Sequence, residues 1–323
     1  MSLGRRGCGT THKGLLPTET SGQSQAEGIV AVASATYRTE SEENEDAVAA
    51  GEHRRLGNYL FLADGVGSLP QAGRAARLLV EQGRKLVRRA SRPEDLEPAT
   101  IFLACHKALV DFVATQPDGN PSGWGSTLLF VGDDGVGKLR LAWLGNGALL
   151  HMRGNFNQFQ SGDLPPWSAL NYLNPHTIEN VQGKESLYRL VSADEAPERI
   201  HPSITEITRD DEFFGDIVIA CTDGILSNDQ IPYGRLADGS LWAKCETPYL
   251  KLFRCLSEFF AREQTPRSSS LESALQAFLN KLRGDNVLDD DASVGVLVTA
   301  RALAVQAEWR NRRQKGSSGD AQS

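Results

Sequence analysis

The stretch Phe61-Leu62-Ala63-Asp64-Gly65-Val66-Gly67-Ser68 decides how this 323-residue sequence is interpreted. A short apolar run, typical of a strand, ends in an aspartate, and a Pro-containing turn then leads into an amphipathic helix expected over 71–90. An Asp-Gly pair after a strand usually marks a simple turn, because Asp bonds its own backbone and Gly accepts positive φ. The recurrence of this pattern in the chain indicates more than a turn.

Three other segments also place acidic residues beside an apolar strand. They are Asn44-Glu45-Asp46-Ala47-Val48, Ile217-Val218-Ile219-Ala220-Cys221-Thr222-Asp223-Gly224 and Asp289-Asp290-Asp291-Ala292-Ser293-Val294. Clustered carboxylates repel one another unless a cation neutralises them. Ligands that are all oxygen select hard cations such as Mg²⁺ or Mn²⁺ over zinc or copper. The pattern therefore predicts a site for hydrolysis by a water activated between two metal ions.

The apolar pattern of the whole chain predicts an α+β fold. The expected strands are 28–36, 46–50, 58–63, 126–131, 138–144, 148–153, 187–191, 203–208, 216–221 and 293–299. The expected helices are 71–90, 97–115, 246–262 and 270–283. Because strands come in runs and helices in pairs, a layered α+β domain is favoured over a doubly wound parallel sheet.

Composition divides the chain into one folded domain, expected over 28–302, and two polar ends. Residues 1–27 are rich in Gly, Ser, Thr and Gln and are predicted to be disordered. Residues 303–323 are predicted to hold the end of a helix and, from 315, a disordered tail. The Asn- and Pro-rich stretch 155–182 is expected to act as a flap, because loops of this length are usually functional or mobile.

Composition also excludes several classes of protein. The 34 basic and 41 acidic residues give a net charge of -7, which disfavours nucleic-acid binding. No apolar run approaches the ~18 residues of a membrane helix. The five cysteines form no Cys-x-x-Cys pair, so neither a zinc site nor a disulfide framework is predicted. A reducing compartment, the cytoplasm, is therefore the expected location.

Six segments, taken in order, resemble the motifs of the metal-dependent serine/threonine protein phosphatases, the PPM or type 2C family, particularly its bacterial members. They are Asn44-Glu45-Asp46, Asp64-Gly65-Val66-Gly67-Ser68, Gly125-Ser126-Thr127, Leu144-Gly145-Asn146-Gly147, Thr222-Asp223-Gly224 and Asp290-Asp291-Ala292-Ser293-Val294. The resemblance implies a four-layer fold, a central β-sandwich of two antiparallel sheets flanked by pairs of helices. It also implies hydrolysis of phosphoserine and phosphothreonine in proteins, opposing a protein kinase, with two Mn²⁺ or Mg²⁺ ions and no covalent intermediate.

The same resemblance implies a set of catalytic metal ligands. Asp64, Asp223 and Asp290 would ligate the ions, with Asp64 bridging them and the Gly65 carbonyl assisting. Glu45 and Asp46 would hold metal-bound waters. Glycine at 65 also allows the backbone to approach an ion closely.

Two of these assignments need a choice among neighbours. Asp290 is preferred to Asp289 and Asp291 because it precedes Ser293 by three residues, as the family aspartate precedes its Thr or Ser. Arg38 is the candidate for binding the substrate phosphate, although it lies six residues before the Asn-Glu-Asp motif, where a closer spacing is usual.

The chain departs from the family pattern at three positions. Asn146 and Ser227 stand where aspartates often help to hold a third metal, so two tight ions are predicted and a third site that is weak or absent. Val66 stands where some members carry a histidine proposed as general acid, and valine cannot donate a proton. Neither His151 nor His176 can be placed from sequence.

These departures leave two alternatives beside a protein phosphatase. One is a degenerate phosphatase-like domain that binds phosphoproteins or a regulatory partner without turnover. The other is a phosphatase that acts on a different phosphoester, such as a small metabolite.

Overall fold

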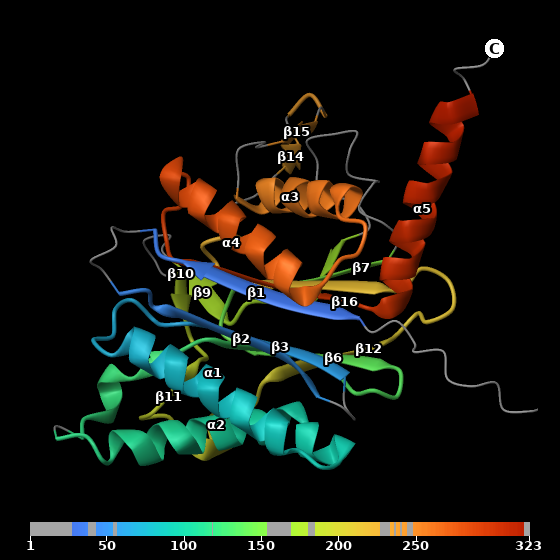
Figure 1. Cartoon of the computed structure of the whole chain (residues 1–323). Coiled ribbons are helices and arrows are strands. Elements are labelled where there is room, and N and C mark those ends of the chain that lie inside the picture. The colour runs from blue at the N-terminus through green and yellow to red at the C-terminus, as the bar shows by residue number, and fades with distance from the viewer. Residues whose placement is uncertain are drawn as a thin grey trace, which may run out of the picture.

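Two five-stranded antiparallel sheets form the centre of the fold (Figure 1). The structure is a computed structural model, and the residues that it describes are 28–37, 43–53, 57–117, 119–153, 169–179, 185–226, 233–235, 237–239, 241–243 and 248–319. The β1 sheet has the order β1-β16-β13-β7-β8, with β1 (Ile29–Ala35), β7 (Ala148–Arg153), β8 (Leu170–Asn171), β13 (Asp216–Cys221) and β16 (Ala292–Val298). The β2 sheet has the order β12-β6-β5-β3-β2, with β2 (Asp46–His53), β3 (Gly57–Asp64), β5 (Leu128–Asp133), β6 (Lys138–Leu144) and β12 (Ser203–Thr208).

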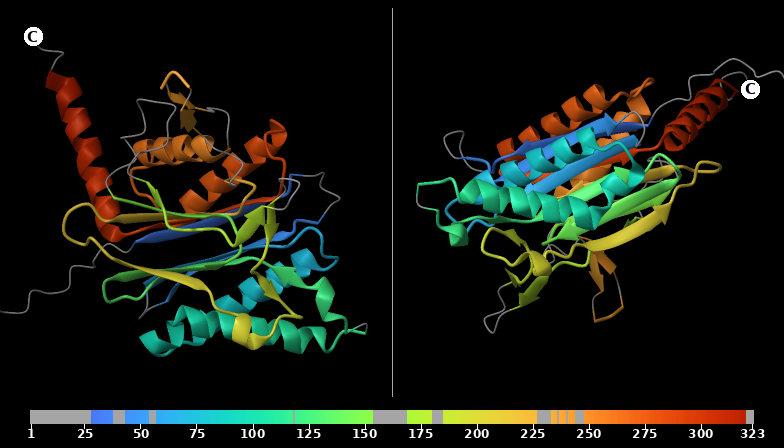
Figure 2. Two further views of the ribbon diagram at one scale, coloured as in Figure 1. Left: turned by 180° about the vertical axis from the view of Figure 1, so that it is seen from behind. Right: turned by 90° about the horizontal axis from the view of Figure 1, so that it is seen from below.

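Pairs of helices cover the outer faces of both sheets. The β2 sheet is covered by α1 (Ala72–Arg89) and α2 (Pro98–Val113), and the β1 sheet by α3 (Pro248–Arg262) and α4 (Ser268–Gly284) (Figure 1). The four layers stay separate when the molecule is seen from behind (Figure 2). The predicted α+β sandwich with flanking helix pairs is therefore confirmed. A further helix, α5 (Ala300–Gly319), follows β16 and projects away from the sandwich.

The remaining elements are short and join these layers. The strands are β4 (Gly125–Ser126), β9 (Thr177–Glu179), β10 (Glu185–Leu187), β11 (Val191–Ser192), β14 (Tyr233–Arg235) and β15 (Leu241–Ala243). Single 3₁₀ turns lie at Pro93–Leu96, Pro121–Gly123 and Pro197–Arg199.

Three apolar clusters hold the layers together. The cluster between the sheets includes Leu60, Leu62, Leu129, Val218 and Leu297. The cluster between the β2 sheet and its helices includes Phe61, Phe130, Leu79 and Phe102. The cluster between the β1 sheet and its helices includes Ile219, Val296, Leu256 and Leu275. Every residue of β13 and β16 is buried, because their sheet is covered on both faces.

Most expected helices and strands are present, and the exceptions have local causes. The strand expected over 187–191 is wrong: β10 ends at Leu187 and β11 begins at Val191. Tyr188 still continues the β9–β10 register, since its amide donates to the His176 carbonyl at 3.0 Å. The chain then changes partner, and Val191 pairs with Ser126 of β4. The strand expected over 126–131 is broken at Thr127, whose backbone turns to Asp64.

The ends of the chain differ from expectation in one respect. The helix expected to end before 315 continues as α5 to Gly319, because the stretch 310–315 is rich in Arg, Gln and Lys, which propagate a helix well. Residues 1–27 of the predicted tail, and 155–168 and 180–182 of the predicted flap, lie outside the described residues. The part of the predicted flap that is described, 169–179, contains β8 and β9.

None of the helices described here combines the length and the apolarity needed to cross a membrane. Cys105, Cys221 and Cys255 are free thiols.

Candidate metal and phosphoester site

The acidic segments identified in the sequence come to one end of the sandwich. Asp46 begins β2 and Asp64 ends β3, and the two residues are direct partners in the β2 sheet. In the β1 sheet, Cys221 at the end of β13 faces Val294 near the start of β16. Asp223 therefore leaves the β1 sheet beside the Asp289–Asp291 loop that enters it, close enough to Asp46 and Asp64 to affect their carboxyl groups.

Asp64 is affected by three of the other acids. Burial raises the pKa of the Asp64 carboxyl well above its usual value, and the carboxylates of Asp46, Asp223 and Asp290 raise it further. The side chains that sequence motifs assign to one centre are therefore close enough to repel one another. Such a cluster favours either bound protons or a bound cation.

Asp46 is buried, with 5% of its surface exposed, as is Asp291. Its Oδ2 accepts a 2.8 Å hydrogen bond from the Thr222 hydroxyl. Its Oδ1 is buried and has no hydrogen-bond partner among the described residues. Burial raises the pKa of Asp46 to about 7, and the charges of Asp223 and Asp291 add to the effect. A buried oxygen that lacks a donor is a group that a cation or its hydration shell would satisfy.

The three consecutive aspartates differ in what they contact. Asp291 is buried, and its carboxylate accepts the backbone amides of Glu45 at 2.6 Å and Tyr37 at 3.1 Å. Asp290 is exposed as a whole residue. The neighbouring protein nevertheless partly desolvates its carboxyl, which raises its pKa to about 6, and the charge of Asp223 adds to this effect. Asp291 thus holds the loops together, whereas Asp290 faces the other carboxylates.

Asp223 receives a hydrogen bond from the residue that replaces a family aspartate. Nδ2 of Asn146 donates to Oδ2 of Asp223 at 2.7 Å. The flanking glycines adopt φ of +114° at Gly145 and +105° at Gly147, a region that favours glycine, and this turn directs Asn146 toward Asp223. The amide orients the carboxylate and contributes no negative charge.

Two glycines are required by packing at this end. A Cβ on Gly65 would lie 2.5 Å from the backbone of Ala72, so glycine is needed for the start of α1 to pack against the loop. This is a different reason from the close approach of an ion inferred from sequence. A Cβ on Gly224 would lie 2.1 Å from the Asp291 carbonyl oxygen, so glycine there lets the two acidic loops meet.

Sequence reasoning assigned no roles to Thr127 and Ser126, which fix the backbone of Asp64. The Thr127 hydroxyl accepts the Asp64 amide at 2.9 Å, and the Thr127 amide donates to the Asp64 carbonyl at 2.8 Å. The Ser126 hydroxyl donates to the same carbonyl at 2.7 Å. Their only sequence signal is the Gly-Ser-Thr motif. Thr222 likewise could be found only through its position in Thr-Asp-Gly.

The two histidines left open by the sequence have structural partners. His176 is buried behind the Asn146 turn, where its Nδ1 accepts the Gly145 amide at 3.2 Å. Burial, with a contribution from Arg189, lowers the pKa of His176 to about 4, so its imidazole is neutral near pH 7. His151 bonds Asp216 at 2.8 Å, at the other end of β13.

Three predicted features cannot be placed. Arg38, Ser227 and most of the flap lie outside the described residues. Glu45 is described, and its Oε2 lies 3.2 Å from the position that a Cβ on Gly67 would occupy. Its side chain thus lies over the turn that follows Asp64.

The carboxylate oxygens of the acidic cluster suit a hard divalent cation, although the described side chains are not arranged around one. Among the described residues, no three His, Cys, Asp or Glu side chains form a group that could hold a metal ion as they stand. Carboxylates without a counter-ion repel, which opposes their convergence. The partnerless Oδ1 of Asp46 and the raised pKa values of Asp64 and Asp290 fit a cation more closely than a purely structural role.

The family model for protein phosphatase 2C matches residues 35–280. The match covers most of the chain, and the chain belongs to this family. No curated protein sequence matches it.

Solved structures share the fold at low sequence identity. The catalytic domain of the serine/threonine phosphatase PstP, solved with two manganese ions, is 18% identical, with a TM-score of 0.54 over 84% of this chain and 97% of that one. Stp1 from Staphylococcus aureus is 13% identical, with a TM-score of 0.57 over 87% and 99%. PppA, a regulatory component of the T6SS in Pseudomonas aeruginosa, is 15% identical, with a TM-score of 0.54 over 84% and 98%.

Proposed function

We propose that this protein hydrolyses phosphoserine and phosphothreonine in proteins, using two Mn²⁺ or Mg²⁺ ions. The observation that carries the proposal is the proximity of Asp46, Asp64, Asp223 and Asp290 at one end of the sandwich. Burial, and then the charges of neighbouring acids, raise the pKa values of Asp46, Asp64 and Asp290. Family membership supports the same conclusion. A cytoplasmic location and an opposing kinase remain predictions.

The roles proposed for the site residues rest on the motifs of the family to which the chain belongs. Asp64, Asp223 and Asp290 would hold the ions, with the Gly65 carbonyl, Glu45 and Asp46 completing their surroundings. When bound, the ions would neutralise the acids and activate a water for attack on phosphorus. Thr222 and Asn146 hold Asp46 and Asp223 in orientation by hydrogen bonds of 2.8 and 2.7 Å.

Residue 66 cannot donate a proton to the leaving seryl or threonyl oxygen. Val66 follows Gly65 and carries no titratable group, and neither His151 nor the neutral His176 is directed into the acidic cluster. A general acid is lost when it deprotonates at high pH, so we expect the pH profile of kcat to lack an alkaline limb from the titration of a histidine acid.

The test is Mn²⁺-dependent hydrolysis of a phosphothreonine peptide and of p-nitrophenyl phosphate. Asp64→Asn and Asp223→Asn should abolish it and lower the bound metal, while Asp289→Asn, a neighbouring exposed aspartate, should leave both unchanged. Wild-type protein without Mn²⁺-dependent activity on any phosphopeptide would contradict the proposal. Hydrolysis confined to small metabolite phosphoesters would show a different substrate class.

A degenerate, non-hydrolysing domain is the second candidate. The observation that favours it is the donor amide of Asn146 on Asp223, at a position where family members often carry an aspartate. Retained metal binding with no turnover on a broad phosphopeptide panel would support this alternative.

A further inference from the structure

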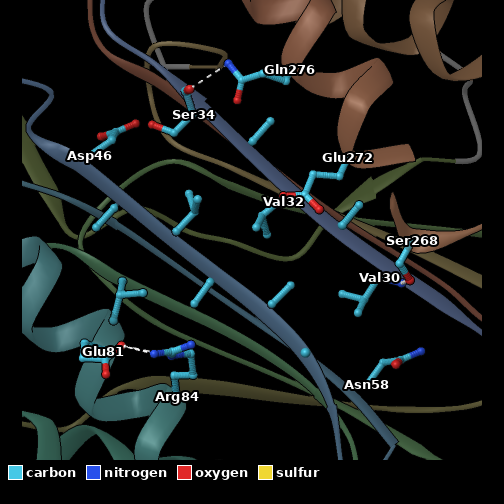
Figure 3. A pocket seen from close by; sticks show the side chains of 18 of the residues that line it. Val30, Val32, Ser34, Asp46, Asn58, Glu81, Arg84, Ser268, Glu272 and Gln276 are labelled. Atoms are coloured by element: carbon cyan, nitrogen blue, oxygen red, sulfur yellow. Dashed lines mark hydrogen bonds and ion pairs between the residues drawn. The ribbon is translucent and has the colours of Figure 1, made fainter. Parts of the chain in front are cut away.

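A groove of about 920 Å³ runs along one open edge of the sandwich, between β1 and β2 (Figure 3). Both strands are edge strands of their sheets. Helix α1 contributes Glu81 and Arg84 to one wall, and α4 contributes Glu272 to the other. Asp46 lies at one end of the groove and Asn58 at the other. The groove thus begins at the acidic cluster and leads away from it.

The floor of this groove presents unpaired backbone of β2. The Glu45 carbonyl accepts the Gly65 amide at 3.2 Å and so faces β3. Backbone groups alternate sides along an antiparallel strand, so those of Val48 and Ala50 face the groove. In agreement, the Asp46 amide turns outward to Oδ1 of Asn44 at 2.8 Å. Within the described residues, the outward N–H and C=O groups of Val48 and Ala50 have no hydrogen-bond partner.

The facing edge of β1 is partly occupied by side chains of α4. The Val30 amide donates to the Ser268 hydroxyl at 3.2 Å, and Gln276 donates to the Ser34 carbonyl at 3.1 Å (Figure 3). These two contacts take the place of a neighbouring strand. The open backbone of the groove therefore belongs mainly to β2.

The side chains of the groove define what it would accept. Val32, Val48 and Ala50 are partly exposed and pack against the cluster between the sheets, which makes the floor apolar. The wall arginines are neutralised, since Arg84 pairs with Glu81 at 2.7 Å and Arg77 pairs with Glu43.

The acids of the groove are not all neutralised in this way. In the described part of the chain, Glu52 and Glu272 have no ion-pair or hydrogen-bond partner. The uncompensated charge of the described residues that line the groove is therefore negative.

We propose that this groove binds an extended segment of another protein, in which apolar and basic residues alternate, as an added strand on the edge of β2. Strand addition supplies partners for the open groups of Val48 and Ala50. Helices on both sides exclude a folded surface and admit a single extended chain. The basic residues of the segment lie on the face of β2 that carries Glu52, toward Glu52 and Glu272. The alternate, apolar residues face Ala47, Ala49 and Val80 on the α1 side of the groove. This binding requires no turnover, so it stands apart from the proposed hydrolysis.

The test uses the full chain and two end-blocked hexapeptides, one of alternating lysine and valine and one of alternating glutamate and valine. Fluorescence anisotropy of labelled peptide should show binding of the lysine peptide only. The amides of Val48 and Ala50 should become protected from hydrogen exchange when it is bound.

Ala50→Pro removes one outward N–H from an edge strand and leaves the ladder to β3 intact. It should weaken binding about tenfold, the effect of losing a hydrogen bond and leaving its partner unsatisfied. Ile204→Pro is the matched control, because Ile204 lies on β12, the opposite edge strand of the same sheet. It should leave binding unchanged.

Charge is tested separately by Glu272→Lys on the exposed face of α4, which should weaken binding of the lysine peptide about fivefold at low salt. Glu258→Lys on α3, outside the groove, should have no effect. If Ala50→Pro does not fold, two other results test the proposal. They are the hydrogen-exchange protection of the Val48 and Ala50 amides in the wild type, and the effect of Glu272→Lys on peptide binding. Absence of lysine-peptide binding at millimolar concentration, equal binding of the glutamate peptide, or binding insensitive to the groove variants would overturn the proposal.

Discussion

Thr222 and Asp46 join the two sheets at the acidic end of the sandwich. The hydroxyl of Thr222, which follows β13, donates a 2.8 Å hydrogen bond to Oδ2 of Asp46, the first residue of β2. The same hydroxyl accepts the Ser293 amide at 2.9 Å. One side chain thus couples β13, β16 and β2, and it satisfies the only oxygen of Asp46 that has a partner among the described residues.

Thr222→Val removes this donor and leaves both oxygens of a buried carboxyl without a hydrogen bond. We expect the free energy of unfolding at pH 8 to fall by about 1–3 kcal/mol. Urea denaturation of metal-free protein measures this change. Thr222→Ser keeps the hydroxyl and should lose clearly less, and equal losses in the two variants would show that the methyl group, and not the hydrogen bond, is responsible.

Asp291 should be more important for stability than its neighbour Asp289. Asp291→Ala removes the acceptor for the amides of Glu45 and Tyr37 and should lower the free energy of unfolding by about 2–3 kcal/mol. Asp289 is exposed, and Asp289→Ala should change it by less than about 0.5 kcal/mol. Thermal unfolding of both variants measures this difference. Equal losses of stability in the two would contradict the conclusion that Asp291 holds the loops together.

The stability of the metal-free protein should depend on pH through the acidic cluster. The pKa of Asp46 is raised to about 7 and that of Asp290 to about 6, both above the usual 3.8. The folded state therefore retains protons that the unfolded state releases. The stabilisation from these protons is complete below about pH 4 and is lost as the pH rises through 6 to 7.

Two measurements check this sign. The Tm of wild-type protein without metal should fall between pH 5 and pH 8 more steeply than that of Asp46→Asn. Millimolar Mn²⁺ should raise the Tm more at pH 8 than at pH 5, because the ion replaces the protons. A Mn²⁺-induced shift that is the same at both pH values would count against a cation site in this cluster.

The number of bound ions should depend on residue 146. Wild-type protein is expected to bind two ions tightly in a calorimetric titration with Mn²⁺. Asn146→Asp replaces the amide on Asp223 with a carboxylate and should add a third, weaker ion. Asn146→Ala is the control, since it removes the same hydrogen bond without adding charge and should bind no additional ion. Three sites of similar affinity in the wild type would refute the prediction.

Much of this architecture could be anticipated from local patterns. Buried strands such as Ile217–Cys221 and amphipathic helices such as 71–90 are visible as apolar periodicity, since each must bury one or both faces. The order of acidic motifs was enough to indicate a family. The errors fell where tertiary contacts override a local pattern, as over 187–191, where the chain leaves β9 after Tyr188 and pairs with β4 from Val191.

The different roles of three consecutive aspartates could not be predicted from the sequence alone. Asp289, Asp290 and Asp291 are chemically identical along the chain. Their surroundings separate them, because Asp291 is buried on two backbone amides and Asp290 faces Asp223.

Residue types and spacing along the chain were thus sufficient for the layered fold, the acidic strand ends and the family. The packing of segments far apart in the sequence decided the rest. It placed Asp291 on the amides of Glu45 and Tyr37, brought Asn146 into hydrogen-bond contact with Asp223, and left the open edge of β2 facing a groove. The physical reason is that burial, hydrogen bonding and charge repulsion arise between neighbours in space, and a residue's neighbours are known only once the two sheets are packed together.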